Sequence, residues 1–455
     1  MPGLFGISVS IENKNKFSED LFKGVFYQQH WNEDYSGLAT IKNSGFETET
    51  HPGLFRASFN KRMGSFNGTE GVGYCGPDKE PLEIDTRIGK ICLCFSGNIR
   101  NSEQLKEMLK KKGVSFSNRR GHNSEIEIIA NMIAQGKDIV DGIKKMGQKI
   151  EGTFTLLVLT TDKIFAARSS DAHWTLTIGQ KKDETIIASS SAGFRNLGLN
   201  IIKDIEPGEI ISIEKGSWKR VGLLPPGEVQ ICSFLGVYSD FPSGTFQGIP
   251  ISLIRKKLGA ILAQQDIEEG FIPDIVAPVP NSGRYYALGY QQEFCRQMNS
   301  GKIKKTPFYD EILIKWPYAG RSFTSENQTK REKETDLKML TSVEDYSGKI
   351  IALIDDSIVR GTTMRTNLIP KLRDMEISEI HLRIGNPPIL SYCRWGKTTK
   401  EEKECFAIQA PSNEEKIKLL KVEGIRYNSI EALVNTIGIS KNQLCRDCCL
   451  ISENI

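Results

Sequence analysis

Two adjacent carboxylates follow an apolar run in the second half of the chain. The run 350–354 ends at Asp355 and Asp356, and a loop that contains Gly361 and two threonines then leads into a helical pattern. A helix N-terminus offers free N–H groups to a phosphate, and paired acids can hold ribose hydroxyls or Mg²⁺. The pattern predicts a site for a phosphorylated ribose. The alternative, a turn with two solvated acids, is disfavoured because strand, acids, loop and helix occur in the required order.

The elements that must position this loop alternate along the second half. Apolar runs typical of buried parallel strands are separated by helical patterns, which favours a doubly wound α/β domain. Pro370 is expected to kink or shorten its helix. The predicted strands are 275–279, 350–354 and 379–383, and the predicted helices are 252–265, 363–375 and 414–423.

The first half has a different pattern of short strand-like runs separated by turn residues and occasional helices. This predicts an α+β domain with several antiparallel strands. Leu224-Pro225-Pro226-Gly227 is the expected linker, so we predict domains at 1–229 and 230–455. The predicted strands include 91–95, 155–159 and 209–213, and the predicted helices include 102–111 and 124–134.

Composition narrows the function classes. The 455 residues carry 60 basic and 56 acidic side chains, a formal net charge of +4, which argues against nucleic acid as the main partner. No apolar run approaches the ~20 residues of a membrane span, and no signal-peptide pattern occurs at the N-terminus. The ten cysteines have irregular spacings that do not suggest a secreted disulfide framework. We therefore expect a cytoplasmic protein without a membrane partner.

The string Asp355-Asp356-Ser357-Ile358-Val359-Arg360-Gly361-Thr362-Thr363 resembles the 5-phosphoribosyl-1-pyrophosphate (PRPP) motif of type I phosphoribosyltransferases. Its form is similar to that of the amidophosphoribosyltransferase family, which opens purine synthesis by placing ammonia from glutamine on PRPP. The resemblance implies that Ser357 to Thr363 cradle the 5-phosphate. It also implies that Asp355 and Asp356 are catalytic and bind Mg²⁺.

Further segments carry the same resemblance. Pro278-Val279-Pro280-Asn281-Ser282-Gly283 resembles a family loop whose Ser helps order Mg²⁺ and pyrophosphate. The segment 314–323 is similar to one that implies PRPP binding by Lys315 and a catalytic role for Arg321. Arg331-Glu332 resembles part of a loop, around 324–340 here, that closes over PRPP. A departure is Trp316-Pro317, where the family has Asn-Arg, and it removes a cation near the closing loop.

Cysteines near the C-terminus form a C-x-x-C pair that alone could be a metal clip, a redox pair or chance. Some family members carry a [4Fe–4S] cluster, and the resemblance implies four ligands here: Cys232, Cys393, Cys445 and Cys448. Cys449 is an extra thiol that could replace a neighbour. The alternative is that these cysteines are buried and unliganded, as we expect for Cys75, Cys92, Cys94, Cys295 and Cys405.

The first half of the chain resembles the family's glutaminase domain but lacks the residues that hydrolyse glutamine there. Related enzymes use an N-terminal Cys as nucleophile, whereas this chain has Pro2 and no Cys before Cys75. The oxyanion-hole Asn is replaced by Ser96, and the residues that clamp glutamine are replaced by Gly73 and Asn123. The early His-Arg-Gly string has become His30-Trp31-Asn32, and neither His30 nor His122 is expected to be catalytic. We predict a pseudo-glutaminase domain.

The combined prediction is a Mg²⁺-dependent phosphoribosyltransferase that releases pyrophosphate. It would transfer the phosphoribosyl group to ammonia or another amine without glutamine, and a partner protein could supply the amine. The alternative is an idle PRPP-binding regulator or scaffold of a genuine amidophosphoribosyltransferase. A third possibility is that glutamine is still used through an unrecognised nucleophile. The resemblance also implies a homo-oligomer.

Overall fold

The structure is a computed structural model that describes residues 1–117, 124–317, 338–396 and 401–450. The chain forms two compact units, and each contains segments from distant parts of the sequence. Unit 1 consists of Met1–Cys232, Asp240–Gly248 and Asn442–Cys445, and unit 2 consists of Ser233–Ser239, Ile249–Lys441 and the residues from Arg446 onward.

Unit 1 contains two antiparallel sheets. One has the strand order β11-β9-β10-β1-β4-β2-β3 and the other has the order β13-β12-β8-β7-β6-β5. The first sheet is formed by β1 (Gly3–Val9), β2 (Tyr35–Lys42), β3 (Gly45–Pro52), β4 (Glu70–Gly76), β9 (Thr177–Lys181), β10 (Glu184–Ala188) and β11 (Asn200–Asp204). The second is formed by β5 (Leu82–Thr86), β6 (Gly89–Ile99), β7 (Gly152–Leu159), β8 (Ile164–Arg168), β12 (Glu209–Glu214) and β13 (Ser217–Leu223).

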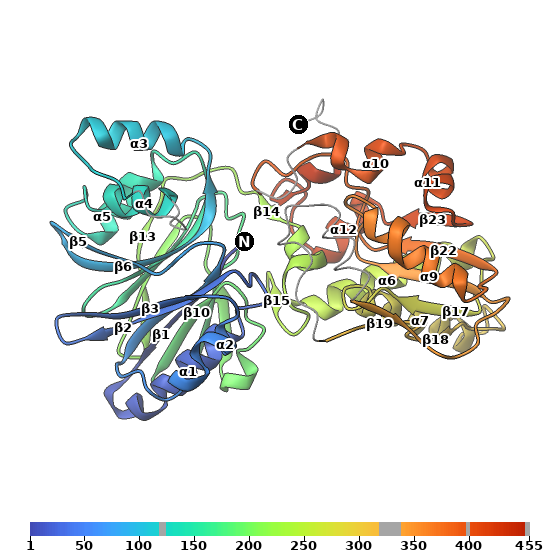
Figure 1. Ribbon diagram of the computed structural model, residues 1–455, viewed down its shortest axis with the longest axis horizontal. Coiled ribbons are helices and arrows are strands. Elements are labelled where there is room, and N and C mark those ends of the chain that lie inside the picture. The colour runs from blue at the N-terminus through green and yellow to red at the C-terminus, as the bar shows by residue number, and fades with distance from the viewer. Residues whose placement is uncertain (118–123, 318–337, 397–400, 451–455) are drawn as a thin grey trace. The chain divides into compact units, whose positions relative to one another are not determined.

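Helices cover the outer faces of these sheets, so unit 1 has a helix–sheet–sheet–helix arrangement (Figure 1). In β6, Ile91, Leu93 and Phe95 pack toward the helices, while Cys92 and Cys94 pack toward the other sheet. This period of two is what a strand buried on both faces requires. The helices are α1 (Lys14–Phe26), α2 (Phe55–Phe59), α3 (Ser102–Lys111), α4 (Ser124–Ile133) and α5 (Ile139–Gly147).

Unit 1 is completed by residues from near the end of the chain. β14 (Ile231–Cys232) pairs in parallel with β24 (Leu444–Cys445), and Cys232 is the register partner of Cys445. The backbone of Ile231 also donates to the carbonyl of Gln443 at 2.8 Å. A short ladder therefore joins two segments of the sequence that are more than two hundred residues apart.

Unit 2 is built on a parallel sheet with the order β18-β17-β21-β22-β23. Residues Ile351–Asp355 of β21 are all buried, because helices lie on both faces of the sheet. The strands are β17 (Ile275–Pro278), β18 (Phe308–Tyr309), β21 (Ile350–Asp355), β22 (Glu379–Ile384) and β23 (Gly424–Tyr427). The main helices are α6 (Ile251–Glu268), α7 (Arg284–Asn299), α9 (Ile369–Asp374), α11 (Asn413–Leu420) and α12 (Ile430–Ile437).

The predicted fold classes of both halves are confirmed, α+β for the first and parallel α/β for the second. Pro370 lies in the first turn of α9, directly after a π-helical turn at Met364–Leu368. A proline lacks the N–H that continues a helix, and widened turns of this kind accommodate such interruptions. None of the helices in the described ranges combines the length and apolar character that crossing a bilayer requires.

Candidate functional site

The acid pair lies where two neighbouring parallel strands end. β17 and β21 are adjacent in register, so the loops that follow them meet at one edge of the sheet. The Ser282 hydroxyl donates to Asp355, with 3.2 Å between Oγ and Oδ1. A Cβ at Gly283 would overlap the carbonyl oxygen of Ile354, so glycine is what allows this loop to approach the strand. The structure thus brings together Ser282, Asp355 and Asp356, three of the predicted site residues.

Both carboxylates are buried, with 8% of Asp355 and 3% of Asp356 exposed. Burial raises the pKa of Asp355 well above its usual range, and the charge of Asp356 adds to this effect. Burial also raises the pKa of Asp356, against the donated hydrogen bonds of Ser357 and Ser282. The Ser357 hydroxyl lies 2.5 Å from Asp356 Oδ2. Two buried acids that resist ionisation together favour a cation or hydroxyl donors as ligands.

These oxygen donors fit Mg²⁺. Magnesium is usually bound by one or two carboxylates, with waters and substrate phosphates completing its shell, rather than by a full protein cage. Asp355 and Asp356 supply the carboxylates, and the hydroxyl of Ser282 is a neutral oxygen beside them. Consistent with a partial set, the described residues contain no group of three or more His, Cys, Asp or Glu arranged to hold a metal ion.

The loop that follows the acid pair is held from one side by the segment before α10 (Phe406–Gln409). The backbone N–H of Phe406 donates to the carbonyl of Val359 at 2.7 Å. Gly361 has a φ of +70°, and an added Cβ would lie 2.7 Å from the Phe406 ring. Both the backbone conformation and the lack of space therefore favour glycine at this position. The Arg360 side chain pairs with Glu404, with 2.9 Å between Nε and Oε2.

The predicted loop residues have different exposures. Ile358 is buried in the main core of unit 2, which suits a packing role. Ser357 and Thr362 are half-buried and Thr363 is exposed, so their hydroxyls lie at the surface where a ligand could reach them. Thr362 and Thr363 immediately precede the helical turn at Met364, which is the position of a phosphate at a helix N-terminus.

Lys315 lies on a two-stranded hairpin formed by β19 (Leu313–Lys315) and β20 (Met339–Thr341). Its register partner is Met339, whose carbonyl accepts a hydrogen bond from Lys371 Nζ at 2.6 Å. Lys371 belongs to α9, so the hairpin is tied to the helix that follows the acid-pair loop. Arg321 and Arg331-Glu332 lie outside the described residues, as does most of the segment 324–340.

In unit 1, Pro2, which the sequence resemblance predicts to stand in place of a nucleophilic Cys, directly precedes β1. Gly73 lies on β4 beside Phe5 and Leu38, and a Cβ at this position would overlap the methyl groups of Val25. Helix α1 therefore leaves no space at Gly73 for a longer side chain. Ser96 is fully buried, and its Oγ has no hydrogen-bond partner in the described part of the chain. Asn123 and His122 lie outside the described residues.

A cysteine on the neighbouring strand β4 lies beside the start of β1. Cys75 is the register partner of Gly3, but its buried thiol points to the carbonyl of Val25 at 3.6 Å. Burial raises the pKa of this thiol far above its usual range, which disfavours the reactive thiolate. His30 Nε2 lies 3.3 Å from Asp240 Oδ1, so this histidine has a structural partner.

The predicted iron–sulfur ligands divide between the two units. Cys232 and Cys445 are register partners in unit 1, whereas Cys393 and Cys448 belong to unit 2. The Sγ atoms of Cys448 and its neighbour Cys449 are 3.9 Å apart. The described residues include all of these cysteines but show no metal-binding group among them. The iron–sulfur cluster stays a prediction.

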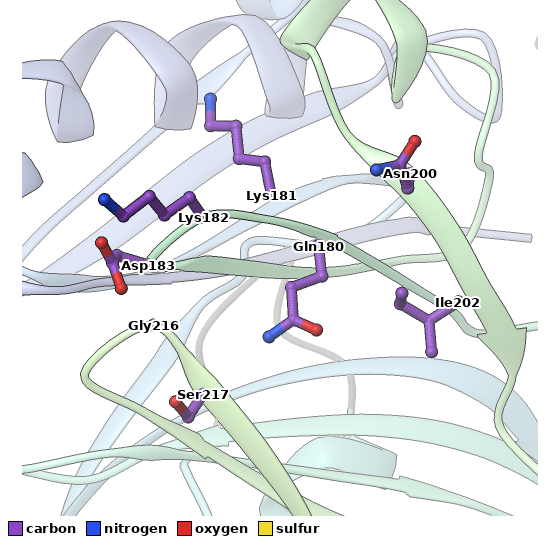
Figure 2. Close-up of a pocket in the computed structure, with 8 residues that line it drawn as sticks. All are labelled: Gln180, Lys181, Lys182, Asp183, Asn200, Ile202, Gly216 and Ser217. Atoms are coloured by element: carbon purple, nitrogen blue, oxygen red, sulfur yellow. The ribbon is translucent and has the colours of Figure 1, made fainter.

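A surface hollow of about 430 Å³ lies in unit 1 at the turn between β9 and β10. Figure 2 shows the Gln180 side chain directed into the space between Ile202 and Ser217, while Lys181 points away from it. Lys181 Nζ instead contacts Asp20 Oδ2 at 2.9 Å. None of the predicted site residues lines this hollow, and its polar lining suggests no particular chemistry.

Comparison with known proteins gives consistent matches. A family model described as a glutamine amidotransferase domain matches residues 76–196. The amidophosphoribosyltransferase of Methanocaldococcus jannaschii is 32% identical over 474 residues, covering 98% of this chain and 96% of that protein. The amidophosphoribosyltransferase of Bacillus subtilis is 27% identical over 430 residues, covering 92% and 86%.

Solved structures extend the likeness to the fold. The glutamine PRPP amidotransferase from B. subtilis, complexed with ADP and GMP, superposes with a TM-score of 0.83 at 27% identity. It covers 98% of this chain and 96% of that one. A structure described as the allosteric regulatory enzyme of purine biosynthesis gives a TM-score of 0.84 at 26% identity, covering 98% and 94%.

Proposed function

This chain belongs to the amidophosphoribosyltransferase family, and from that membership we propose that unit 2 transfers a phosphoribosyl group from PRPP to an amine. The observation that carries the proposal is the placement of the half-buried Ser282 beside the buried Asp355 and Asp356 at the ends of two adjacent parallel strands. Ligands of open α/β sheets bind at this edge. The cation site is rich in oxygen donors but incomplete. It therefore suits a substrate whose phosphates can supply further ligands to the cation.

The proposed reaction is a substitution at C1 of the ribose. The amine nitrogen forms a bond to C1, the C1–O bond breaks with its electron pair leaving on pyrophosphate, and the amine proton passes to solvent. Asp355 and Asp356 would hold Mg²⁺ and ribose hydroxyls, and Ser282 would help to place the pyrophosphate. When bound there, the cation would supply charge stabilisation for the leaving group. Lys315 and Arg321 are the cations proposed to contact PRPP, and the loop Ser357–Thr363 receives the 5-phosphate.

We further propose that this transfer does not use glutamine. Pro2 has no thiol, and the buried Cys75 cannot replace it. Packing of Val25 against Gly73 supports the loss of a glutamine clamp, and the short Ser96 side chain supports the loss of an oxyanion donor. The acceptor is then free ammonia or another amine, which a partner protein could deliver.

A second candidate function is an idle PRPP-binding regulator or scaffold of a genuine amidophosphoribosyltransferase. The observation that favours it is Trp316, which is 45% exposed at the end of β19, next to Lys315. The family resemblance places a polar residue at Trp316 and a cation at the next position, Pro317. Under this reading the chain binds PRPP but does not turn it over.

Other properties remain proposals of the same kind. We place the protein in the cytoplasm as a homo-oligomer, acting in purine or nucleotide-related metabolism. A [4Fe–4S] cluster on Cys232, Cys393, Cys445 and Cys448 would tie the C-terminal tail to the rest of the protein and take no part in the chemistry.

The deciding experiment uses the full chain, purified without oxygen, with PRPP and Mg²⁺. One sample contains an ammonium salt and the other contains glutamine, and both pyrophosphate and glutamate are followed. We expect pyrophosphate with ammonium and none with glutamine. Glutamate formation would overturn the proposed loss of glutaminase activity. No release in either sample, together with PRPP binding in a titration, would favour the regulator or an untested acceptor.

A further inference from the structure

The backbone of Asp355 and Asp356 accepts hydrogen bonds from the residues that follow the neighbouring strand, β22. After β22 ends, the backbone N–H of Gly385 donates to the carbonyl of Asp355 at 2.9 Å, and that of Asn386 donates to the carbonyl of Asp356 at 2.7 Å. A Cβ at Gly385 would overlap the ring of Tyr286, so this turn is packed without spare volume. The position of Asp356 therefore depends on the position of Asn386.

The Asn386 side chain is fixed by a residue near the C-terminus. Only 1% of Asn386 is exposed, and its Nδ2 donates to Cys449 Sγ at 3.5 Å. The same Nδ2 also donates to the carbonyl of the adjacent Pro387 at 2.8 Å, which is a local contact. Its Oδ1 is buried without a hydrogen-bond partner in the described part of the chain. Cys449 is thus the distant group that orients this amide.

Cys449 is in turn held firmly in unit 2. It lies in a 3-10 turn, Asp447–Cys449, and belongs to a small buried cluster with Ile389 and Cys405. The carbonyl of the preceding residue, Cys448, accepts hydrogen bonds from the backbone of Leu390 at 2.7 Å and of Ser391 at 3.2 Å. The C-terminal turn and the segment after β22 therefore support each other through backbone and side-chain contacts.

A second route connects the same cluster to the phosphate loop. Val359 packs at the edge of the cluster that contains Cys405 and Cys449. Cys405 is followed by Phe406, whose N–H donates to the carbonyl of Val359, and is preceded by Glu404, which pairs with Arg360. The phosphate loop of the predicted PRPP site thus contacts this buried cluster through Val359, and the acid pair is linked to it through Asn386.

We propose that the Cys448–Cys449 turn helps to fix the geometry of the PRPP site. Asn386 is the positioning residue, because its side chain bonds to Cys449 and its backbone bonds to Asp356. The inference rests on the proposed function, because PRPP is the ligand whose binding would report on it. It concerns the contact between Asn386 and Cys449, and Cys449 is not among the four predicted cluster ligands. Asn386 bonds to the backbone of Asp356, which is proposed to hold Mg²⁺, and partners that orient metal ligands typically alter affinity about 10- to 100-fold when removed.

The test measures binding of PRPP with Mg²⁺ to the full chain by titration calorimetry. Asn386→Ala and Cys449→Ala are each expected to weaken binding about 10-fold. Cys449→Ser keeps a small acceptor and should recover part of the loss. Cys295→Ala removes another half-buried thiol of unit 2, on α7, and should bind as the unaltered chain does. Iron content, measured in parallel, separates these effects from any change in a cluster.

A reciprocal measurement uses the unaltered protein and so does not depend on variants that fold. Coupling between two sites acts equally in both directions. PRPP with Mg²⁺ should therefore slow amide hydrogen exchange in peptides covering 446–450, and this slowing should vanish in Asn386→Ala. If the unaltered chain binds no PRPP, the proposed function fails. If it binds PRPP but exchange at 446–450 is unchanged and Cys449→Ala binds normally, only this inference is overturned.

Discussion

The Ser282 hydroxyl donates to the Asp355 carboxylate across 3.2 Å, joining two loops that are 73 residues apart in the sequence. The bond exists because β17 and β21 run in parallel side by side, which brings their carboxyl ends to one edge. Ser282 lies just before α7, which begins at Arg284, and Asp355 is the last residue of β21. Two segments that carry separate motifs thereby become one site.

Removing this hydroxyl should weaken cation binding without unfolding the protein. Ser282→Ala deletes a neutral oxygen beside two buried acids, and we expect the Mg²⁺ concentration needed for PRPP binding to rise about 10-fold. Calorimetry at several Mg²⁺ concentrations measures this. Ser300→Ala, at the other end of α7, removes a hydroxyl bonded only to its own helix and should leave the Mg²⁺ dependence unchanged. Equal effects of the two substitutions would argue against a cation site.

Packing at Gly73 should tolerate no side chain. Gly73→Ala places a methyl group into Val25, and overpacking of this kind typically costs about 1–3 kcal/mol in free energy of unfolding. Gly45→Ala, on β3 of the same sheet, places a Cβ with only Lys90 Nζ nearby, at 3.9 Å, and should change stability by less than about 0.5 kcal/mol. Denaturant unfolding compares the two.

The background Val25→Ala provides the coupling test for the same contact. In that background Gly73→Ala should cost clearly less, since the overlapping methyl groups are gone. An unchanged cost would mean that the backbone, and not Val25, excludes side chains from this position. That result would also remove one support for the loss of the glutamine clamp.

A buried charge cluster in unit 1 should make stability depend on pH. Burial, together with the nearby Asp20, raises the pKa of Glu184 from 4.5 to about 7, against the opposing effect of Lys181. The folded chain then holds this proton more tightly than the unfolded chain does. The contribution to stability is complete below pH 4.5 and is lost as the pH rises through about 7.

Glu184→Gln should therefore flatten the stability profile between these pH values. The free energy of unfolding, followed by denaturant titration at several pH values, should fall less steeply than in the unaltered chain. Asp171 and Asp204 of unit 1 also have pKa values raised by burial, so part of the slope should remain. A slope that is identical in both proteins would show that Glu184 ionises normally.

The buried ion pair of unit 2 should be costly to break. Asp266 is fully buried and accepts from Arg383 Nε at 2.6 Å, and Arg426 NH1 lies 3.0 Å from its other oxygen. Asp266→Ala removes the carboxylate partner of the buried Arg383 guanidinium, and we expect a loss of about 3–5 kcal/mol in unfolding free energy. Thermal and denaturant unfolding of the purified variant measure this loss.

An exposed pair provides the matched control. Lys403 Nζ lies 2.6 Å from Glu401 Oε2, but the two side chains are 82% and 56% exposed, respectively. Lys403→Ala should change stability by less than about 1 kcal/mol, because water solvates the remaining carboxylate. Similar losses from the buried and exposed pairs would contradict the role assigned to burial.

Much of the architecture could be predicted because its signals are local. A few consecutive apolar residues were enough to predict each of the strands β6, β7, β17, β21 and β22. The loop after Asp355 was likewise predicted from a short run of residues. The two-residue strands β14 and β18 were missed because so short a segment has no measurable period, and β23 (Gly-Ile-Arg-Tyr) was missed because it lacks the continuous apolar run that marks β17.

The rest of the site depends on contacts between distant residues. Asn386 and Cys449 are 63 positions apart, and Asp266 and Arg383 are 117 apart, so no local pattern could pair them. The motif predicted a phosphate role for Arg360, whereas its pairing with Glu404 arises only once α10 packs beside the loop. Residue types were visible in the sequence, but their partners were fixed by the fold.

The ladder between β14 and β24 has a consequence for synthesis of the chain. Unit 1 uses Leu444–Cys445, which leave the ribosome about 210 residues after Ile231–Cys232. At the usual 5–20 residues per second, this delay is about 10–40 s. During that interval the first half of the nascent chain lacks a strand that it keeps in the finished protein. Separating the halves at residue 229 would place both strands of this ladder in the second piece, so the first piece would lack both of them.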